Sequence, residues 1–195
     1  MPLSTLDPKT ALIVIDLQQG IVSLPLVHPI TEVVNNARAL ADAFRSHGLP
    51  VVLVNVAGGA PGRTEQPRGA LNFPPGWTDL VPELNRQPSD HAITKYTPGA
   101  FPKTGLEEHL RGLGVTQVVL AGVATSIGVE STARQAYENG FHVTLAIDAM
   151  TDRSMDSHNY TVGNIFPRLG ETGKTQEILD LLRGASPDTG RSASS

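Results

Sequence analysis

Strand-length apolar segments that alternate with segments of helical periodicity constrain the fold of this chain more than any other feature. Residues 11–17 form a short apolar run that carries one carboxylate near its end, Asp16, and residues 51–56 form a second run. Such runs are typical of strands covered on both faces, as in parallel sheets. Between them, apolar residues repeat at helical spacing over residues 30–44, and Gly48 follows as a stop signal. The segment is therefore a β-α-β unit, whose crossover is expected to be right-handed.

The same alternation continues to the end of the chain. We expect strands over residues 91–95, 117–123, 141–147 and 170–173, helices over residues 104–113, 125–139, 154–166 and 176–182, and a short helix over residues 77–84. The pattern predicts the α/β fold class: a single-domain three-layer αβα sandwich around a central, mostly parallel six-stranded sheet of Rossmann-like type.

The length of 195 residues suits one domain, which we place at residues 1–183. Residues 184–195 are rich in Ser, Gly, Pro and Asp and are expected to form a flexible C-terminal tail. Residues 57–75 lose all periodicity, and a loop of that length in a compact domain usually has a function.

Composition excludes several classes of function. A formal net charge of −4 gives no electrostatic reason to expect nucleic acid or an anionic membrane as a partner. The chain has no cysteine, which excludes disulfides and thiol nucleophiles. The six histidines show no metal-ligand spacing, so neither a metal nor another cofactor is expected. The N-terminus does not resemble a secretory signal and the apolar runs are too short to span a membrane, so we expect a cytoplasmic protein.

Three polar features fall where predicted strands end. Asp16 closes the first strand, Lys95 closes the strand at residues 91–95, and a sharp turn at residues 122–128 follows the strand at residues 117–123. In a doubly wound sheet, ligands bind outside the carboxyl ends of the strands. The topology therefore predicts that these groups gather at one edge of the sheet.

These three motifs, in this order and over about residues 11–182, resemble the isochorismatase-like hydrolase superfamily, which includes nicotinamidases and N-carbamoyl amidohydrolases. In most of that family an Asp, a Lys and a Cys form a catalytic triad. The resemblance carries the Asp onto Asp16 and the Lys onto Lys95, whereas the position of the nucleophile holds Gly128. It also implies a cis peptide bond between Val123 and Ala124.

The resemblance implies a specific chemistry for a family member with Gly at the nucleophile position. Family members that carry Gly at the nucleophile position hydrolyse a vinyl ether without a covalent intermediate, with the Asp as general acid. On this reading Asp16 handles the proton, Lys95 orients the substrate or stabilises negative charge, and the N–H groups of Ala124 and Gly128 bind an oxyanion. The apolar run before Asp16 raises the pKa of its carboxyl and a nearby Lys95 lowers it, and the sequence leaves the outcome open.

Further candidates for substrate binding are Arg68, Gln18, Phe101, Val123, Ala124, Thr125 and Ser126. Arg68 matches an Arg that isochorismatases use, but those enzymes have Tyr at the position of Ala124, and their Gln falls on Gly59 or has no equivalent. Two alternatives stay open: an inactive family member that binds a small molecule, and a hydrolase that uses the hydroxyl of Thr125 or Ser126, neither of which has a His nearby in the sequence. The resemblance also implies a homodimer or higher homo-oligomer as the assembly.

Overall fold

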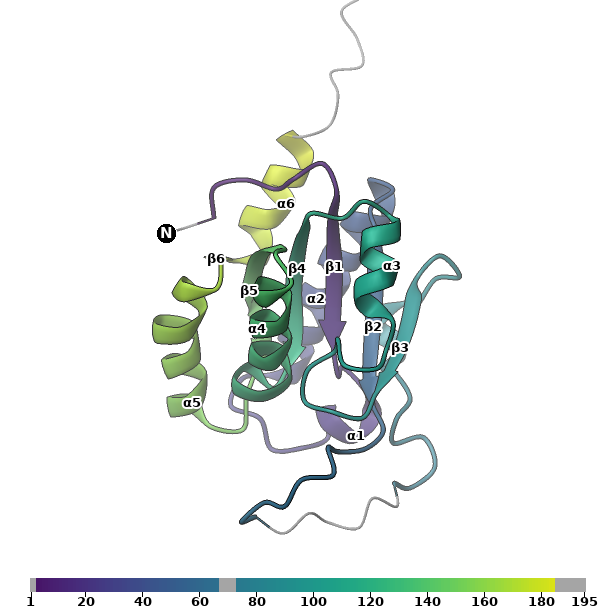
Figure 1. Ribbon diagram of the computed structural model, residues 1–195, viewed down its shortest axis with the longest axis vertical. Helices are drawn as coiled ribbons and strands as arrows, with labels where there is room; N and C mark the ends of the chain where they lie inside the picture. The colour runs from purple at the N-terminus through teal and green to yellow at the C-terminus, as the bar shows by residue number, and fades with distance from the viewer. Residues whose placement is uncertain (1–2, 67–72, 185–195) are drawn as a thin grey trace, which may run out of the picture.

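The computed structural model describes residues 3–66 and 73–184 and has one central sheet (Figure 1). The sheet has six strands in the order β3-β2-β1-β4-β5-β6, and all neighbouring strands run parallel. The strands are β1 (Thr10–Ile15), β2 (Val51–Val56), β3 (His91–Lys95), β4 (Gln117–Val123), β5 (His142–Thr151) and β6 (Glu171–Gly173). The fold class and the number of strands are as predicted from the sequence, and the sheet is entirely parallel rather than mostly so.

Helices cover both faces of the sheet and complete three layers. Helices α2 (Ile30–Ser46) and α6 (Thr175–Gly184) pack on one face, whereas α3 (Leu106–Gly112) and α4 (Glu130–Glu138) pack on the other (Figure 1). The shorter helices are α1 (Gln19–Val22), α5 (Met155–Tyr160), the 3-10 turns Pro82–Leu84 and Phe166–Arg168, and the π-helical turns Thr125–Val129 and Thr161–Ile165. In the part of the chain that is described, no helix combines the length and the apolar character that a membrane crossing requires.

The central position of β1 in the sheet explains why residues 11–15 are all apolar. Ala11, Ile13 and Ile15 pack into the core beneath α3 and α4. Leu12 and Val14 point to the opposite side, into the core beneath α2 and α6. Because side chains alternate between the two faces of a strand, a central strand with helices on both faces needs apolar residues at every position.

The strand order changes direction between β1 and β4, which is where the fold predicts a ligand site. The two strands approach closely there, since a Cβ atom at Gly122 would lie 1.9 Å from the carbonyl oxygen of Ile15. Gly122 also has a φ of +118°, which glycine adopts without steric cost. The peptide bond between Val123 and Ala124, just after Gly122, is cis, as the resemblance implied.

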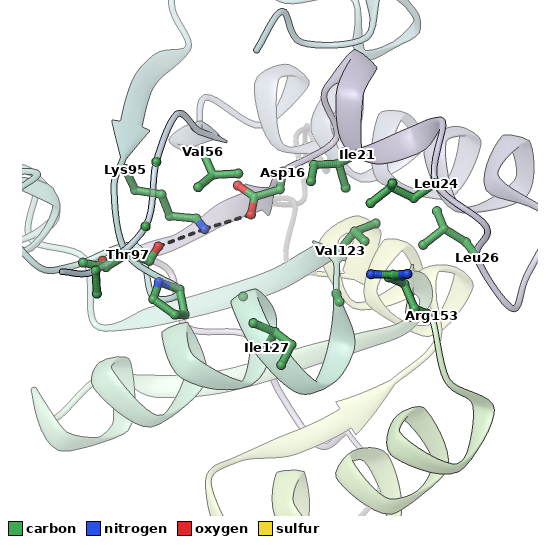
Figure 2. A pocket seen from close by; sticks show the side chains of 16 residues that line it. Asp16, Ile21, Leu24, Leu26, Val56, Lys95, Thr97, Val123, Ile127 and Arg153 are labelled. Carbon is green, nitrogen blue, oxygen red and sulfur yellow. Dashed lines mark hydrogen bonds and ion pairs between the residues drawn. The ribbon is translucent and has the colours of Figure 1, made fainter. Parts of the chain in front are cut away.

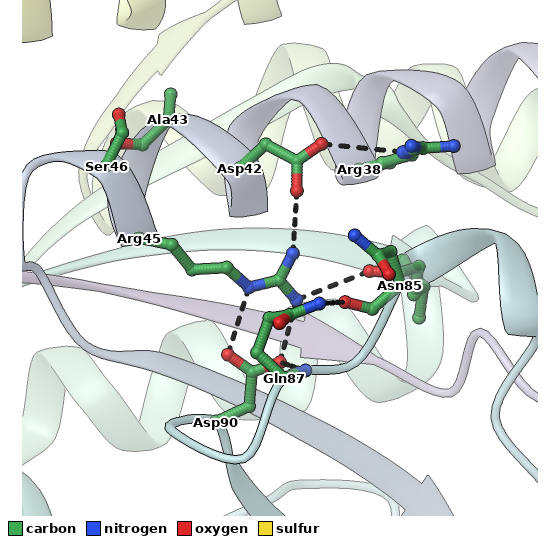
Figure 3. Close-up of polar contacts among 9 residues, drawn as sticks. Arg38, Asp42, Ala43, Arg45, Ser46, Asn85, Gln87 and Asp90 are labelled. Carbon is green, nitrogen blue, oxygen red and sulfur yellow. Dashed lines mark hydrogen bonds and ion pairs between the residues drawn. The ribbon is translucent and has the colours of Figure 1, made fainter.

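An ion-pair cluster fixes the entry into β3, the strand that carries Lys95 (Figure 3). The guanidinium of Arg45, near the end of α2, donates from Nε and Nη2 to the two carboxylate oxygens of Asp90 at 3.0 and 2.7 Å. Asp42 accepts a third hydrogen bond from Arg45 at 2.8 Å. Bidentate Arg–carboxylate pairs are directional, so this contact holds the start of β3 against the helical layer.

Three predicted elements differ most from the structure. Residues 77–84 are helical only at the 3-10 turn Pro82–Leu84. Their backbone instead pairs with the segment after β1: the N–H of Gly20 donates to Trp77 O, and that of Val81 to Leu17 O. These contacts satisfy the backbone groups that a helix would use internally.

The other two differences lie in the C-terminal third of the chain. Strand β5 continues past residue 147 to Thr151 through a register shift against β4. Asp148 therefore lies inside β5, where its carboxylate accepts hydrogen bonds from the N–H and hydroxyl of Thr175 and caps α6. The helix predicted over residues 154–166 is divided into α5, a π turn and a 3-10 turn that contains Pro167. Helix α6 includes Gly184, and the remainder of the predicted tail lies outside the described residues.

Candidate active site

A cavity of about 360 Å³ lies outside the carboxyl ends of the strands (Figure 2). This volume is within the range of small-molecule sites. Its wall is mostly apolar and is formed by the last residues of β2, β3 and β4 and by the segments that follow β1 to β5. The lining residues are Asp16, Ile21, Leu24, Leu26, Val56, Gly58, Gly59, Ala60, Lys95, Thr97, Pro98, Val123, Ala124, Ile127, Gly128 and Arg153. The parallel strands, whose carboxyl ends share one edge of the sheet, thus bring the three motifs of the sequence to one place.

A buried ion pair joins two of the predicted residues. The Nζ of Lys95 lies 2.8 Å from Oδ2 of Asp16, and it also donates to the carbonyl oxygen of Thr97 at 3.2 Å. The side chains of Asp16 and Lys95 are only 7% and 2% exposed. The other carboxylate oxygen, Oδ1, is buried and has no hydrogen-bond partner among residues 3–66 and 73–184. One oxygen of Asp16 is therefore held by the ammonium, and the other is free to carry a proton.

Burial decides the protonation of Asp16. Loss of hydration raises the pKa of its carboxyl to about 6, although the ammonium of Lys95 acts in the opposite direction by charge attraction and hydrogen bonding. A carboxyl with this pKa is partly protonated near neutral pH, which suits a proton donor. The backbone of Asp16 has a φ of +52°, a conformation that Asp and Asn tolerate better than most residues.

Gly128 leaves little free space beside the carboxylate. It lies in the π-helical turn that follows β4, and a Cβ atom there would lie 3.1 Å from Ile15 Cγ2, 3.2 Å from Val123 O and 3.4 Å from Asp16 Oδ2. Gly128 is thus adjacent to Asp16. The contacts are tight, so even a methyl group would require its neighbours to shift slightly.

Gln18 and Phe101 do not line the cavity, in contrast to the expectation from the sequence. The buried amide of Gln18 accepts from the N–H of Val56 at 2.7 Å and donates to the carbonyl oxygens of Val56 and Trp77. Its role is to tie the ends of β1 and β2 together. Phe101 packs against the core, with its ring centroid 6.1 Å from that of Phe141.

The two candidate hydroxyl nucleophiles also lie outside the cavity wall. Thr125 is fully buried, and its hydroxyl oxygen lies 2.8 Å from Nδ1 of His158. A histidine partner is thus present, although it comes from 33 positions later in the chain. Ser126 donates its hydroxyl and its backbone N–H to the carboxylate of Asp152 at 2.8 and 2.7 Å. Both hydroxyls therefore stabilise the turn, and neither reaches the cavity.

Sequence reasoning did not select most of the other wall residues, among them Ile21, Leu24, Leu26 and Arg153. The first three belong to α1 and the loop after it, a segment too short to show periodicity. Arg153 directly follows Thr151 and Asp152 at the true end of β5. Because ligands bind outside the carboxyl ends of the strands, Arg153 becomes a candidate once β5 is known to continue past residue 147. Arg68 lies outside the described residues.

Comparisons of the sequence and of the structure with known proteins point to the same family. Residues 10–177 match the model of the isochorismatase domain family. The chain is 41% identical over 182 residues to an uncharacterized isochorismatase family protein of Bacillus subtilis, covering 90% of this chain and 95% of that protein. It is 28% identical over 194 residues to the isochorismatase of Bacillus subtilis, covering 93% of this chain and 61% of that protein. An isochorismatase family protein from Burkholderia thailandensis superposes with a TM-score of 0.88 at 41% identity, covering 92% of this chain and 98% of that structure.

Proposed function

The chain belongs to the isochorismatase family, and on that premise we propose that it is a hydrolase that acts on a small molecule without a covalent thiol intermediate. The observation that carries the proposal is the buried Asp16–Lys95 pair in the wall of an apolar cavity, next to Gly128. Because the chain contains no cysteine, a hydrolase built on it needs a proton-transfer route instead of thiolate attack. Cytoplasmic location and homo-oligomeric assembly stay predictions.

The reaction that suits this residue set best is hydrolysis of a vinyl ether. The protonated carboxyl of Asp16 transfers its proton to the terminal carbon of the C=C bond, which leaves an oxocarbenium ion and the Asp16 carboxylate. Lys95 stabilises that carboxylate by its 2.8 Å contact. Water adds to the oxocarbenium carbon and returns a proton to Asp16, and the hemiketal collapses to a ketone and an alcohol. The backbone N–H groups of Ala124 and Gly128 are proposed to hold an oxygen of the substrate.

Incubation with isochorismate tests the specific version of this proposal. We expect release of pyruvate, measured through coupled oxidation of NADH by lactate dehydrogenase, at a rate well above that of the Asp16→Asn variant. Saturable binding of isochorismate without pyruvate release would instead identify a family member that binds its ligand without turnover. Equal rates for the two proteins would contradict the assignment of Asp16.

The pH dependence of this activity has a defined sign. An essential general acid must be protonated in the free enzyme, and the pKa of Asp16 is raised to about 6. We therefore expect kcat/KM to be constant below pH 6 and to fall about tenfold per pH unit above it. Initial rates between pH 5 and pH 8.5 at low substrate concentration measure this profile. A rate that increases through pH 6 would identify Asp16 as a base instead.

A methyl group at Gly128 is expected to impair turnover. In Gly128→Ala the new Cβ crowds Ile15 and the Asp16 carboxylate, so we expect kcat/KM to fall by about tenfold, equivalent to about 1.4 kcal/mol of transition-state stabilisation. Gly112→Ala is the matched control, because Gly112 is also helical and, apart from its own helix backbone and chain neighbours, no described atom lies within 4 Å of its added Cβ. Equal activity of the two variants would show that crowding of Ile15 and the Asp16 carboxylate does not affect turnover.

A further inference from the structure

Two histidines that do not line the cavity are in contact beside a segment that does. His28 lies in segment 23–29, which follows α1 and contributes Leu24 and Leu26 to the cavity wall (Figure 2). His158 is a buried residue of α5. The two rings meet edge to face, with their centroids 4.6 Å apart. The contact therefore joins part of the cavity wall to a helix that lies outside the cavity.

Each ring has a buried threonine hydroxyl as its partner. Nδ1 of His28 lies 2.9 Å from Oγ1 of Thr151, the last residue of β5, and Nδ1 of His158 lies 2.8 Å from Oγ1 of Thr125. Both threonines are fully buried. Among the described residues, neither hydroxyl has another acceptor for its hydrogen. Because a buried donor without an acceptor is costly, each hydroxyl donates to Nδ1, which leaves the ring neutral with its hydrogen on Nε2.

Protonation of either ring disturbs this arrangement. The added proton binds at Nδ1, because Nε2 already carries its hydrogen. The threonine hydroxyl then has to turn, and its own hydrogen loses its acceptor inside the protein. Two charged rings also repel each other across 4.6 Å. Burial and the neighbouring His28 lower the pKa of His158, and the charge of Asp152 opposes them only in part. The observed contact therefore favours neutral rings.

The carboxylates next to the pair are already engaged. Asp152 accepts with Oδ1 from the two backbone N–H groups that follow it, and with Oδ2 from Ser126. Glu130, at the start of α4, accepts from Thr161 at 2.8 Å and pairs with Arg134 at 2.9 Å. The other charged side chains of the adjoining segments are exposed to water: Glu32, Arg153 and Asp156. In the part of the chain that is described, no carboxylate forms an ion pair with either ring, so nothing compensates for a second positive charge.

The attachment of segment 23–29 depends on the same threonine. Within residues 3–66 and 73–184, three hydrogen bonds tie the segment to the end of β5. The N–H of Val27 donates to the carbonyl oxygen of Asp152 at 2.9 Å, and the N–H of His28 donates to Oγ1 of Thr151 at 3.2 Å. The third is the contact between that oxygen and the His28 ring. Two of the three bonds therefore change when the Thr151 hydroxyl turns.

From these contacts we propose that His28 and His158 form a proton-sensitive latch, which in its neutral form holds segment 23–29 in the cavity wall and which loosens on acidification. Both are positioning residues, because neither lines the cavity. A released segment exposes the rings to water, where the pKa of histidine is about 6.5. Attachment is therefore strongest above that pH, and each ring that stays neutral in the attached state weakens it by up to about tenfold per pH unit below. The inference holds for whatever ligand the cavity binds.

Amide hydrogen exchange of Val27 and His28 measures the attachment directly, because both N–H groups donate across the contact. Exchange rates from NMR at pH 6.5 and pH 5, compared with the intrinsic rates of the unfolded sequence, give protection factors. We expect both wild-type factors to fall by about tenfold or more between the two pH values. Amides of the central strand β1 are the internal reference and should not lose protection.

The double variant His28→Asn/His158→Asn separates protonation from packing. Oδ1 of Asn lies as many bonds from Cα as Nδ1 of His, so it can accept from the same hydroxyl, but it takes up no proton. We expect its protection factors at the two pH values to agree within about twofold. His91→Asn/His109→Asn is the matched control: these rings also stack, with centroids 3.7 Å apart, but they belong to β3 and α3 and do not line the cavity. It should keep the pH response of the wild type.

Imidazole NMR spectra of the wild type test the same point without a substitution, and they decide it even where the double variant does not fold. We expect both neutral rings to carry their hydrogen on Nε2, and the pKa of His158 to lie below its ordinary value. A neutral ring with its hydrogen on Nδ1 would overturn the inference. So would wild-type protection that does not change with pH, or an equal loss of protection in the double variant.

Discussion

Replacement of Asp16 by Asn is expected to reduce hydrolysis by about 10²- to 10⁴-fold, the usual contribution of a positioned general acid. The amide has nearly the same shape but cannot donate a proton of comparable acidity. Asn also tolerates the φ of +52° at this position, so the backbone after β1 should keep its conformation. Among the described residues of the cavity wall, Asp16 is the only carboxylic acid, so no neighbour can replace it as the donor.

The measurement is kcat/KM for pyruvate release, together with the far-ultraviolet circular dichroism spectrum and the thermal midpoint of each protein. Asp148→Asn is the control: this carboxylate lies on the same sheet but caps α6 away from the cavity. It should keep its activity while losing about 1 kcal/mol of stability from the weakened cap. Activity of Asp16→Asn within a few-fold of wild type would show that the proton comes from elsewhere.

The centre of the site could be predicted from the sequence because it depends only on where the parallel strands end. Asp16 and the turn that contains Gly128 each follow a strand whose apolar run is easy to recognise, and Lys95 is the last residue of β3. In a parallel sheet, carboxyl ends of strands share an edge, so these residues had to meet. Arg153 obeys the same rule, but β5 continues through an irregular register that leaves no periodic signal in the sequence.

The side-chain orientation of residues that adjoin the site in sequence was the least predictable part of the site. Gln18 and Thr125 are each close in sequence to a residue of the cavity wall, yet both point away from it and satisfy buried polar groups. The histidine that contacts Thr125 arrives from α5, and local sequence contains no information about that contact. The pKa of Asp16 was open for a related reason, because the balance between burial and Lys95 depends on how completely the pair is enclosed.

Replacement of Lys95 by Met is expected to make the stability of the protein strongly dependent on pH. In the wild type, the pKa of Asp16 is raised from 3.8 to about 6, so the folded state holds this proton more tightly than the unfolded state. The contribution of this group to stability is therefore greatest below pH 4 and is lost as pH rises toward 6, by roughly 3 kcal/mol in total. Without the ammonium, the pKa of Asp16 rises further, and the loss continues at higher pH.

Urea unfolding at pH 5 and pH 8 measures this effect. At pH 8 the Lys95→Met variant must either bury an unpaired carboxylate or hold a proton against the solution, so we expect it to be less stable than the wild type by about 3–5 kcal/mol. At pH 5 the carboxyl of Asp16 is protonated, and the difference should be much smaller. The exposed residue Lys174 provides the control, since Lys174→Met should show no such pH dependence. The double variant Asp16→Asn/Lys95→Met has no carboxyl to titrate, so the difference between pH 5 and pH 8 should disappear. A difference that persists in the double variant would show that it arises from a group other than Asp16, and the account of the buried pair would then be wrong.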